Sequence, residues 1–495
     1  MRRLSLLVTV AAFLLSLGIL FRHVPAAAQS EQSAALMRTA GSTPVTPKPP
    51  LAGSSLATPI VPVGSTLYMA KRGDTVTSVA HHFLSQTSFL TSSELAEAIR
   101  KANVDLEKKT FFKPGEPVLV PGILDAPIVE KTVPVARDFE VRAVYLTGLM
   151  AGSDHGLRII RHWREVGGNA VVFDIKDSDG SVNIPFEHPL LGKHHTPLPD
   201  LPKFVRFLHS QNMHAIARVA IFRDEHLVVG HPELAVKSHR TGQPWKENGK
   251  LVWTDPSQPK VQEYNIALAM KAAQAGVDEV QFDYVRFPAE GDQKDASFVF
   301  QSEHPDWHRT DVITDFLKHA YGELHPTGVL LSLDVFGVMA WQRQVDLAHT
   351  GQDIVGMAQH CDVISPMIYP SHFFGMDGIA HPGDAPEHFI GTSMDRFILI
   401  TKGSGVVIRP WLQAFHWRTK TYSPQYIEVQ VQTAKEKGGI GFLFWNAAND
   451  YSKPYMAMPE MRAAKGKYFR GDEIPGSVQA NVRHEGAPAQ SPEVP

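Results

Sequence analysis

Two aspartates near the middle of the chain have the setting of a carboxylate pair. Asp283 ends the β-rich run VQFD, and Asp334 ends the next such run, LLSLD. Cleavage of a glycosidic bond needs two carboxyl groups, one that protonates the leaving oxygen and one that acts as nucleophile or activates water. Asp283 and Asp334 are therefore the candidate catalytic residues, and the chemistry that they indicate is glycoside hydrolysis.

The alternation of side chains along a strand assigns each aspartate to a face. In VQFDYVRF, Tyr284 and Arg286 lie on one face and Asp283 on the other, whereas in LLSLDVFG Asp334 shares its face with Ser332. If the two runs are neighbouring parallel strands, their carboxyl ends meet at one edge. We expect both aspartates to face the same site.

A structural ion pair is the alternative interpretation of these aspartates. Arg218, Arg223 and Arg286 lie on or just after strand-like runs and could neutralise an aspartate without any catalysis. Asp174 competes with Asp334 for the place beside Asp283. The partner of Asp283 therefore stays open between these two residues.

Further polar and aromatic side chains close the other strand-like runs, and we expect them to line the same ring. The candidate substrate-binding residues are Asp174, Lys176, Arg218, Tyr284, Arg286, Tyr369, His372, Gln413, Trp445 and Asn446. Aromatic rings suit a sugar ligand, because the apolar C–H face of a pyranose stacks on them.

The segment DIKDSDG, which begins at Asp174, has two possible interpretations, a turn and a calcium site. Its later aspartates, Asp177 and Asp179, fit a turn in which carboxylates cap backbone amides around Gly180. The D-x-x-D-x-D pattern also suggests calcium, but the spacing and the later Glu of an EF-hand loop are absent. The sequence has no HExxH motif, so we expect neither a metal nor another cofactor.

Eight short β-rich runs alternate with helical stretches in the larger part of the chain. The runs cover residues 141–148, 169–177, 213–222, 278–288, 328–337, 361–370, 406–415 and 439–447. Most are apolar for about five residues and turn polar at the carboxyl end, as parallel strands covered on both faces do. Eight strands alternating with helices predict an α/β fold, a closed (β/α)8 TIM-type barrel over residues 141–467, with its site at the carboxyl-end mouth.

A smaller unit over residues 66–122 precedes the barrel, with the order strand, helix, helix, strand. Its segments YMAKRGDTVTSVAHHF and FFKPGEPVLVPG, and Asn103 at the end of the second helix, resemble a LysM domain. The resemblance implies a βααβ module that binds glycans containing N-acetylglucosamine. A spacer that kept this fold and lost the sugar is the alternative, and LSQTSFLTSS lengthens the link between the helices.

The ends of the chain and the connecting segments differ in composition from these two units. Residues 1–28 begin with Arg2 and Arg3 before an apolar run, the pattern of an export signal or of an uncleaved membrane anchor. Linkers are expected over 29–65 and 123–140, and a disordered tail over 468–495. We therefore predict an exported protein, periplasmic, envelope-associated or extracellular, with membrane contact only if the N-terminal segment is retained.

The overall charge and the single cysteine narrow the possible partners. The chain has 48 Lys and Arg against 51 Asp and Glu, a net charge of −3, which offers no electrostatic footprint for nucleic acid. Cys361 has no partner for an internal disulfide, and it opens an apolar run in which a buried, inert thiol is expected.

The barrel segments resemble a bacterial family described as a putative glycoside hydrolase domain. The matching stretches include AVVFDIKDSDG, DEVQFDYVRFP, SPMIYPSHF and FWNAANDY. The resemblance implies a barrel fold and a carbohydrate substrate. Related α-amylases and α-galactosidases carry a nucleophilic Asp at the end of the fourth strand, which maps onto Asp283. Amylases place a Glu acid/base where this chain has Asp334, and an Arg where it has Gln281.

Three hypotheses of function follow. The first is a glycosidase that acts on a cell-envelope or extracellular polysaccharide by two-carboxylate acid/base catalysis. The second is a non-catalytic, lectin-like envelope protein that binds glycan in the barrel groove. The third, metal-dependent deacetylation of a glycan, lacks an assembled set of His and Asp ligands in the sequence.

Overall fold

The computed structural model describes residues 61–103, 111–132 and 135–471. The predicted export signal, most of the first linker and most of the C-terminal tail lie outside the described residues. Within them, no helix is long and apolar enough to span a bilayer.

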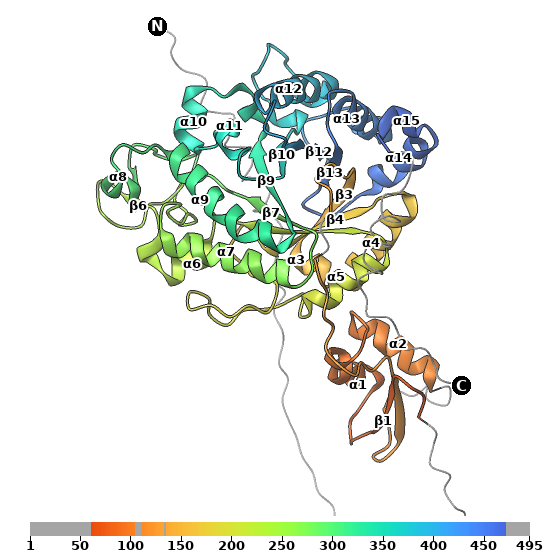
Figure 1. Ribbon diagram of the computed structural model, residues 1–495. Coiled ribbons are helices and arrows are strands. Elements are labelled where there is room, and N and C mark those ends of the chain that lie inside the picture. Colours follow the sequence, from red (N-terminus) through yellow and green to blue (C-terminus); the bar gives the residue numbers. More distant parts are fainter. Residues whose placement is uncertain (1–60, 104–110, 133–134, 472–495) are drawn as a thin grey trace, which may run out of the picture.

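The larger unit is a closed barrel of parallel strands surrounded by helices (Figure 1). Its strands are β3 (Val141–Leu146), β4 (Ala170–Lys176), β5 (His214–Ala220), β7 (Glu279–Asp283), β9 (Leu330–Phe336), β10 (Val363–Met367), β11 (Val407–Ile408), β12 (Trp411–Gln413) and β13 (Gly441–Trp445). Pairing runs in chain order from β3 around to β13, and β13 pairs with β3 to close the ring. This confirms the predicted (β/α)8 barrel.

The seventh position of the barrel is shared by two short strands, β11 and β12. Arg409 and Pro410 separate them, and β10 pairs with both. Proline has no N–H to donate to a neighbouring strand, so the ladder breaks there. The predicted single run over 406–415 is therefore divided.

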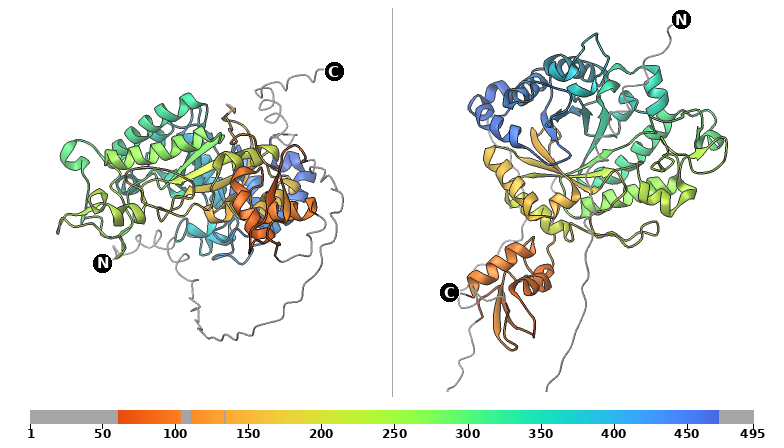
Figure 2. Two further views of the ribbon diagram at one scale, coloured as in Figure 1. Left: turned by 90° about the horizontal axis from the view of Figure 1, so that it is seen from below. Right: turned by 180° about the vertical axis from the view of Figure 1, so that it is seen from behind.

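Helices cover the outside of the barrel, and Figure 2 shows this ring from two further sides. The longer ones are α4 (Asp154–Val166), α5 (Leu201–Ser210), α7 (Pro259–Gln274), α9 (Arg309–Leu324), α12 (Pro386–Ile400), α13 (Pro424–Glu436) and α14 (Ser452–Ala463). Shorter elements in the connections are α3 (Gly148–Ala151), α6 (Glu225–Gly230), β6 (Lys237–Ser238), β8 (Ala296–Ser297), α8 (Phe300–Glu303), α10 (Gln344–Thr350), α11 (Ile354–Met357) and α15 (Lys465–Tyr468).

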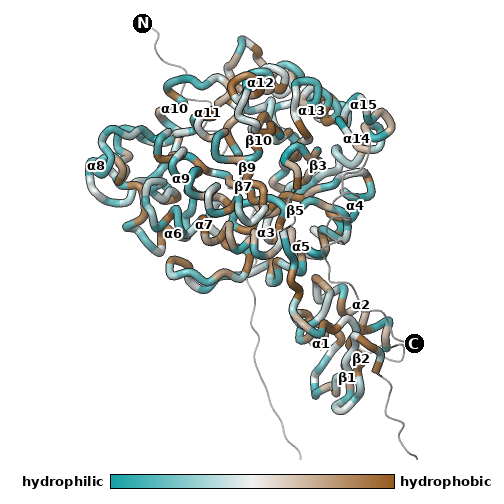
Figure 3. Tube along the Cα trace, in the orientation of Figure 1, coloured by the Kyte–Doolittle hydropathy of each residue, from teal (hydrophilic) through white to brown (hydrophobic). Residues whose placement is uncertain are grey.

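The strands are buried on both faces, which explains their nearly continuous apolar runs. On β7, Phe282 stacks outward on Phe316 of α9, with ring centroids 5.9 Å apart, and both side chains are fully buried. In Figure 3 the hydrophobic residues accordingly concentrate on the strands inside the helical ring. A polar residue that points to the barrel axis is thus surrounded by protein and needs a partner.

The small unit pairs β1 (Ser65–Met69) antiparallel with β2 (Pro117–Pro121) and packs α1 (Val76–Phe83) and α2 (Ser92–Ala102) against them. Thr75 caps α1 by accepting from the Ser78 amide. The side chain of Asn103 bonds the end of α2 to β2, donating to Leu119 O at 2.8 Å and accepting from Leu119 N at 2.9 Å. The order strand, helix, helix, strand agrees with the prediction.

The long link between α1 and α2 contacts the barrel. Lys203, at the start of α5 and only 4% exposed, donates its ammonium to Leu84 O at 3.0 Å and to Phe89 O at 3.3 Å. Nearby, Thr91 bonds Asp154 at 2.5 Å, at the start of α4. The small unit therefore docks beside the starts of α4 and α5 (Figure 1). In a β/α barrel the helix starts lie on the same side as the carboxyl ends of the strands.

Candidate active site

Three aspartates converge on one arginine inside the barrel. Arg218 of β5 donates from Nη1 to Asp174 of β4 at 2.5 Å and from Nη2 to Asp283 at the end of β7. Its Nε lies 3.7 Å from Oδ2 of Asp334, on β9. Three consecutive strand pairings bring these four residues together, as the positions of the strand ends predicted.

Aromatic side chains hold the cluster from the side of the last strands. The hydroxyl of Tyr145 donates to Asp174, and the Tyr145 ring stacks on Trp445 with centroids 4.1 Å apart. The indole N–H of Trp411 donates to Oδ1 of Asp334 at 2.6 Å. Tyr145 and Trp411 were not among the predicted site residues.

The three carboxylates differ in their access to solvent. The side chain of Asp283 is 10% exposed, that of Asp334 is 1% exposed and that of Asp174 is fully buried. A group that attacks or deprotonates a reactant must contact it. Among the three, Asp283 is the carboxylate best placed to meet a ligand at the mouth.

The electrostatics of the cluster favour a charged Arg218 and the ionisation of fewer than three of the aspartates. Burial raises the pKa of Asp174 well above its usual value, although Arg218 acts against this rise. Burial and the negative charge of Asp283 likewise raise the pKa of Asp334. The aspartates hold the pKa of Arg218 well above its usual value against the effect of burial, so the guanidinium stays charged.

The strand that carries Asp283 ends abruptly after it. Tyr284 has φ +52°, a left-handed conformation that is uncommon for a bulky residue, and its amide donates to Oδ1 of Asp283 at 2.6 Å. The predicted alternation through Tyr284 and Arg286 is therefore wrong beyond Asp283. Strain of this kind persists only where the surroundings fix it, and here it orients the carboxylate.

Arg286 packs among aromatic rings next to the cluster. Its guanidinium carbon lies 4.7 Å from the ring centroid of Trp253, 5.3 Å from that of Tyr284 and 4.4 Å from that of Phe336. Its Nη1 donates to Phe287 O at 3.0 Å. The predicted binding residues Tyr284 and Arg286 thus lie together at the mouth.

Lys176 lies apart from the aspartate cluster. Its ammonium pairs with Asp224 at 2.7 Å and donates to Asn265 of α7 at 2.9 Å, and the side chain is fully buried. The pairing of β4 with β5 shifts register between Asp174 and Lys176, so the two side chains do not share a face. The structure therefore places Lys176 in an internal ion pair, where it meets no substrate in this conformation.

The remaining predicted binding residues lie on the sixth to eighth strand ends. Gln413 donates to Phe415 O at 3.0 Å, and Asn446 donates to Ala414 O at 2.6 Å, so both amides brace backbone. Tyr369 is buried, and the His372 ring lies 4.7 Å from that of Trp417. Burial lowers the pKa of His372 to about 4, and Arg418 adds to the effect, so the imidazole is neutral at pH 7.

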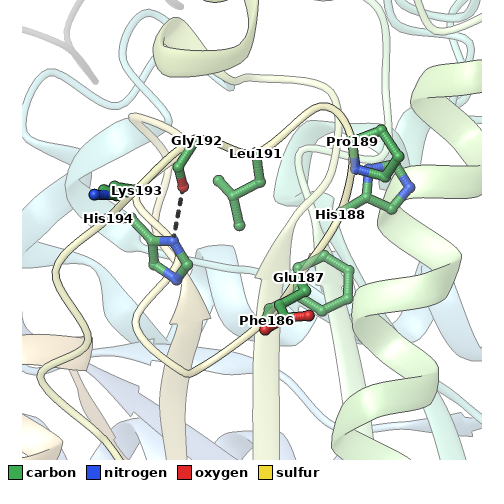
Figure 4. A pocket seen from close by; sticks show the side chains of 8 residues that line it. All are labelled: Phe186, Glu187, His188, Pro189, Leu191, Gly192, Lys193 and His194. Atoms are coloured by element: carbon green, nitrogen blue, oxygen red, sulfur yellow. Dashed lines mark hydrogen bonds between the residues drawn. The ribbon is translucent and has the colours of Figure 1, made fainter.

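A surface cavity of about 730 Å³ lies along the loop after β4 (Figure 4). Its lining includes Phe186, His188, Leu191 and His194 but none of the clustered aspartates. His194 bonds to Gly192 O at 3.2 Å, which folds the loop upon itself. Among the described residues, no group of three or more His, Cys, Asp or Glu side chains could hold a metal ion.

The barrel matches one family model, whose description is "Putative glycosyl hydrolase domain", over residues 143–451. The chain belongs to this family. The match begins within β3 and extends past β13, so it covers the whole candidate site.

One solved structure agrees with this fold. The glycoside hydrolase domain of PgaB (BpsB) from Bordetella bronchiseptica aligns with a TM-score of 0.50 and 15% identity, over 67% of this chain and 99% of that one. A hypothetical protein from Ruminiclostridium thermocellum ATCC 27405 is 36% identical over 39% of this chain and 97% of its own, with a TM-score of 0.35. None of the curated proteins compared with the chain matches it.

Proposed function

We propose that this member of the family hydrolyses glycosidic bonds in a cell-envelope or extracellular polysaccharide, with Asp283 as nucleophile or as base toward water. The observation that carries the proposal is the placement of Asp283. Arg218 and the Tyr284 amide bind its two oxygens, and it is the most exposed of the three clustered carboxylates. A fixed carboxylate beside aromatic walls suits an oxocarbenium-like transition state.

The chain itself would supply three actions in this reaction. Arg218 and Tyr284 orient the Asp283 carboxylate toward the mouth. Trp445, partly exposed and backed by the buried ring of Tyr145, provides an aromatic wall for the apolar face of a sugar. The buried, uncharged form that burial favours for Asp334 limits the negative charge next to Asp283.

We further propose that the protein is exported and that the small unit binds glycan containing N-acetylglucosamine, as its LysM-like segments suggest. This would bring the barrel to an envelope polymer. Binding of chitin oligomers by the βααβ unit would support this assignment.

Non-catalytic glycan binding is the competing function, and one observation favours it. Within the Arg218 cluster, Asp174 and Asp334 are buried, so the cluster presents a single accessible carboxylate where hydrolysis needs two.

One experiment separates hydrolysis from binding. The wild type, Asp283→Asn and the control Asp315→Asn, an exposed aspartate on α9, are incubated with peptidoglycan, chitin oligomers and α- and β-glucans. New reducing ends and retained protein are measured separately. We expect release by the wild type and the control and a loss of at least about 10³-fold in Asp283→Asn. Equal retention by all three proteins without release from any glycan would leave the binding function.

A further inference from the structure

A second carboxyl group lies at the mouth, outside the Arg218 cluster. Glu290 belongs to the loop that follows β7 and is partly buried. Its Oε2 accepts from Asn248 at 3.2 Å, and its backbone carbonyl accepts from Gln293 at 2.5 Å. The Asn248 contact joins the loop after β7 to the long loop after β5, and the Gln293 contact closes a turn within the loop after β7.

The position of this loop is fixed by close packing. Gly291, the next residue, has φ +73°, and a Cβ placed on it would lie 2.9 Å from the ring of Trp245. A larger residue would therefore have to move the loop or the indole. Glu290 is thus held by its neighbours on both loops.

Arg286 connects Glu290 with Asp283 electrostatically. Burial lowers the pKa of the Arg286 guanidinium, and the negative charges of Glu247, Asp283 and Glu290 act against that effect. Both carboxyl groups therefore act on the same buried cation at the mouth. Among the described residues, no carboxylate lies within 4.0 Å of the Arg286 guanidinium. The carboxylates therefore act on Arg286 from a distance and form no direct ion pair with it.

A buried donor beside Arg286 lacks a partner. The Trp253 ring packs 4.7 Å from the Arg286 guanidinium carbon, and the side chain is 1% exposed. Its indole N–H has no hydrogen-bond partner in the part of the chain that the structure describes. An unsatisfied buried donor is costly, and a ligand hydroxyl at this wall would satisfy it.

We propose that Glu290 is the general acid that works with Asp283. This inference rests on the function proposed above and names the second carboxyl group that hydrolysis needs. Asp334, the other candidate catalytic residue from the sequence, is 1% exposed, and Trp411 already binds one of its oxygens. Asp334 instead helps to set the charge of the Arg218 cluster.

The proposed step conserves atoms and charge. The carboxylic acid of Glu290 gives its proton to the glycosidic oxygen while the bond from C1 to that oxygen breaks and its electron pair goes to the oxygen. Asp283 either bonds to C1, forming a glycosyl ester that water later cleaves while the Glu290 carboxylate takes the proton of that water, or takes a proton from a water that bonds to C1. The products are an alcohol and a hemiacetal.

The surroundings of Glu290 suit a proton donor near neutral pH. Burial and the charge of Glu247 raise the pKa of Glu290 to about 7, against the opposing effects of Arg286, Asn248 and Arg223. Because the acid must be protonated, activity should fall as pH rises above about 7. Glu247→Gln removes the nearby negative charge, so it should move this alkaline limb to lower pH.

The test compares Glu290→Gln with Glu323→Gln, the same change at an exposed site on α9. The substrates are the glycan that the wild type cleaves and the 2,4-dinitrophenyl glycoside of the same sugar. We expect Glu290→Gln to lose about 10²- to 10⁴-fold in kcat/KM on the glycan. The loss on the dinitrophenyl glycoside should be much smaller, since that leaving group departs without a proton.

Several outcomes would overturn the proposal. An equal loss on both substrates would indicate a structural role, and near-normal cleavage of the glycan by Glu290→Gln would exclude the acid role. If the alkaline limb of the pH profile does not shift in Glu247→Gln, the acid role of Glu290 is also excluded. This measurement does not depend on the folding of Glu290→Gln. If the wild type cleaves no glycan, the proposed function fails together with this inference, whereas the other outcomes leave hydrolysis standing.

Discussion

At the scale of single residues, Arg218 determines how the buried aspartates can coexist. It contacts Asp174 and Asp283 directly and lies 3.7 Å from Asp334. Without its charge, the barrel interior would hold carboxyl groups that must either lose their ionisation or remain unpaired. Arg218 is therefore as important for folding as for the orientation of Asp283.

Replacing Arg218 with Met should lower the free energy of unfolding at pH 7 by about 3–5 kcal/mol, because it strands buried partners of the ion pair. Urea denaturation measures the change. Arg343→Met, which removes the partly exposed ion pair with Asp346, should cost less than about 1 kcal/mol. Similar small losses in both variants would argue against a central role for Arg218.

The sequence allowed the strand-end aspartates and Arg218 to be predicted, because parallel strands bring their carboxyl ends together. It did not allow the side chains of Tyr145, Trp411 and Lys176 to be placed. A run that is apolar on both faces carries no signal for which face points inward, and the register shift after Asp174 turns Lys176 away. Glu290 lies on a loop, where the alternation of side chains along a strand does not predict the direction of a side chain.

At the scale of elements, the opposite ends of the strands hold a second buried network. Glu279, the first residue of β7, accepts from Arg409 at 2.8 Å and lies 3.1 Å from His214 of β5. Burial alone would raise the pKa of Glu279, but Arg409 and His214 outweigh it and hold the pKa at about 2. This network joins β5 and β7 to the break between β11 and β12 at the floor of the barrel.

The lowered pKa of Glu279 predicts how stability changes with pH. The unfolded chain binds a proton at this carboxyl group more readily than the folded chain does. Stability from this group is thus fully present above about pH 5 and is lost as pH falls toward 2. Its size is on the order of 3 kcal/mol.

Thermal unfolding between pH 7 and pH 3 tests this expectation. Glu279→Gln should be less stable than the wild type at pH 7, and its unfolding temperature should change less on acidification. Glu323→Gln serves as the control and should follow the wild type. A profile of Glu279→Gln that runs parallel to the wild type would contradict the assignment.

At the scale of the whole molecule, the sequence indicated two units but not their contact. The lengthened link LSQTSFLTSS departs from the LysM pattern, and it provides the docking segment, residues 84–91. Lys203 donates to carbonyls of a segment far away in the sequence, and such a contact produces no periodic pattern of residue types. The docking could therefore not have been predicted from the chain alone.

Lys203→Met should loosen the docking of the small unit, since Phe89 O loses its Lys203 donor and Leu84 O keeps only its bonds from Thr87 of the same link. Amide hydrogen exchange in the docking segment should become faster by about tenfold or more, while exchange in the barrel strands stays unchanged. Lys402→Met, at an exposed site after α12, is the control. Unchanged exchange in the docking segment would show that other contacts suffice.

If both units bind glycan, as proposed above, the docking segment has a consequence for how long a polymer stays bound. With the two units held together, a glycan captured by one would meet the other at a constant effective concentration, independent of linker length. A chain long enough to reach both would dissociate only when both contacts open at once, whereas a short oligosaccharide would exchange freely. Residence time on this protein would then depend on the length of the polymer.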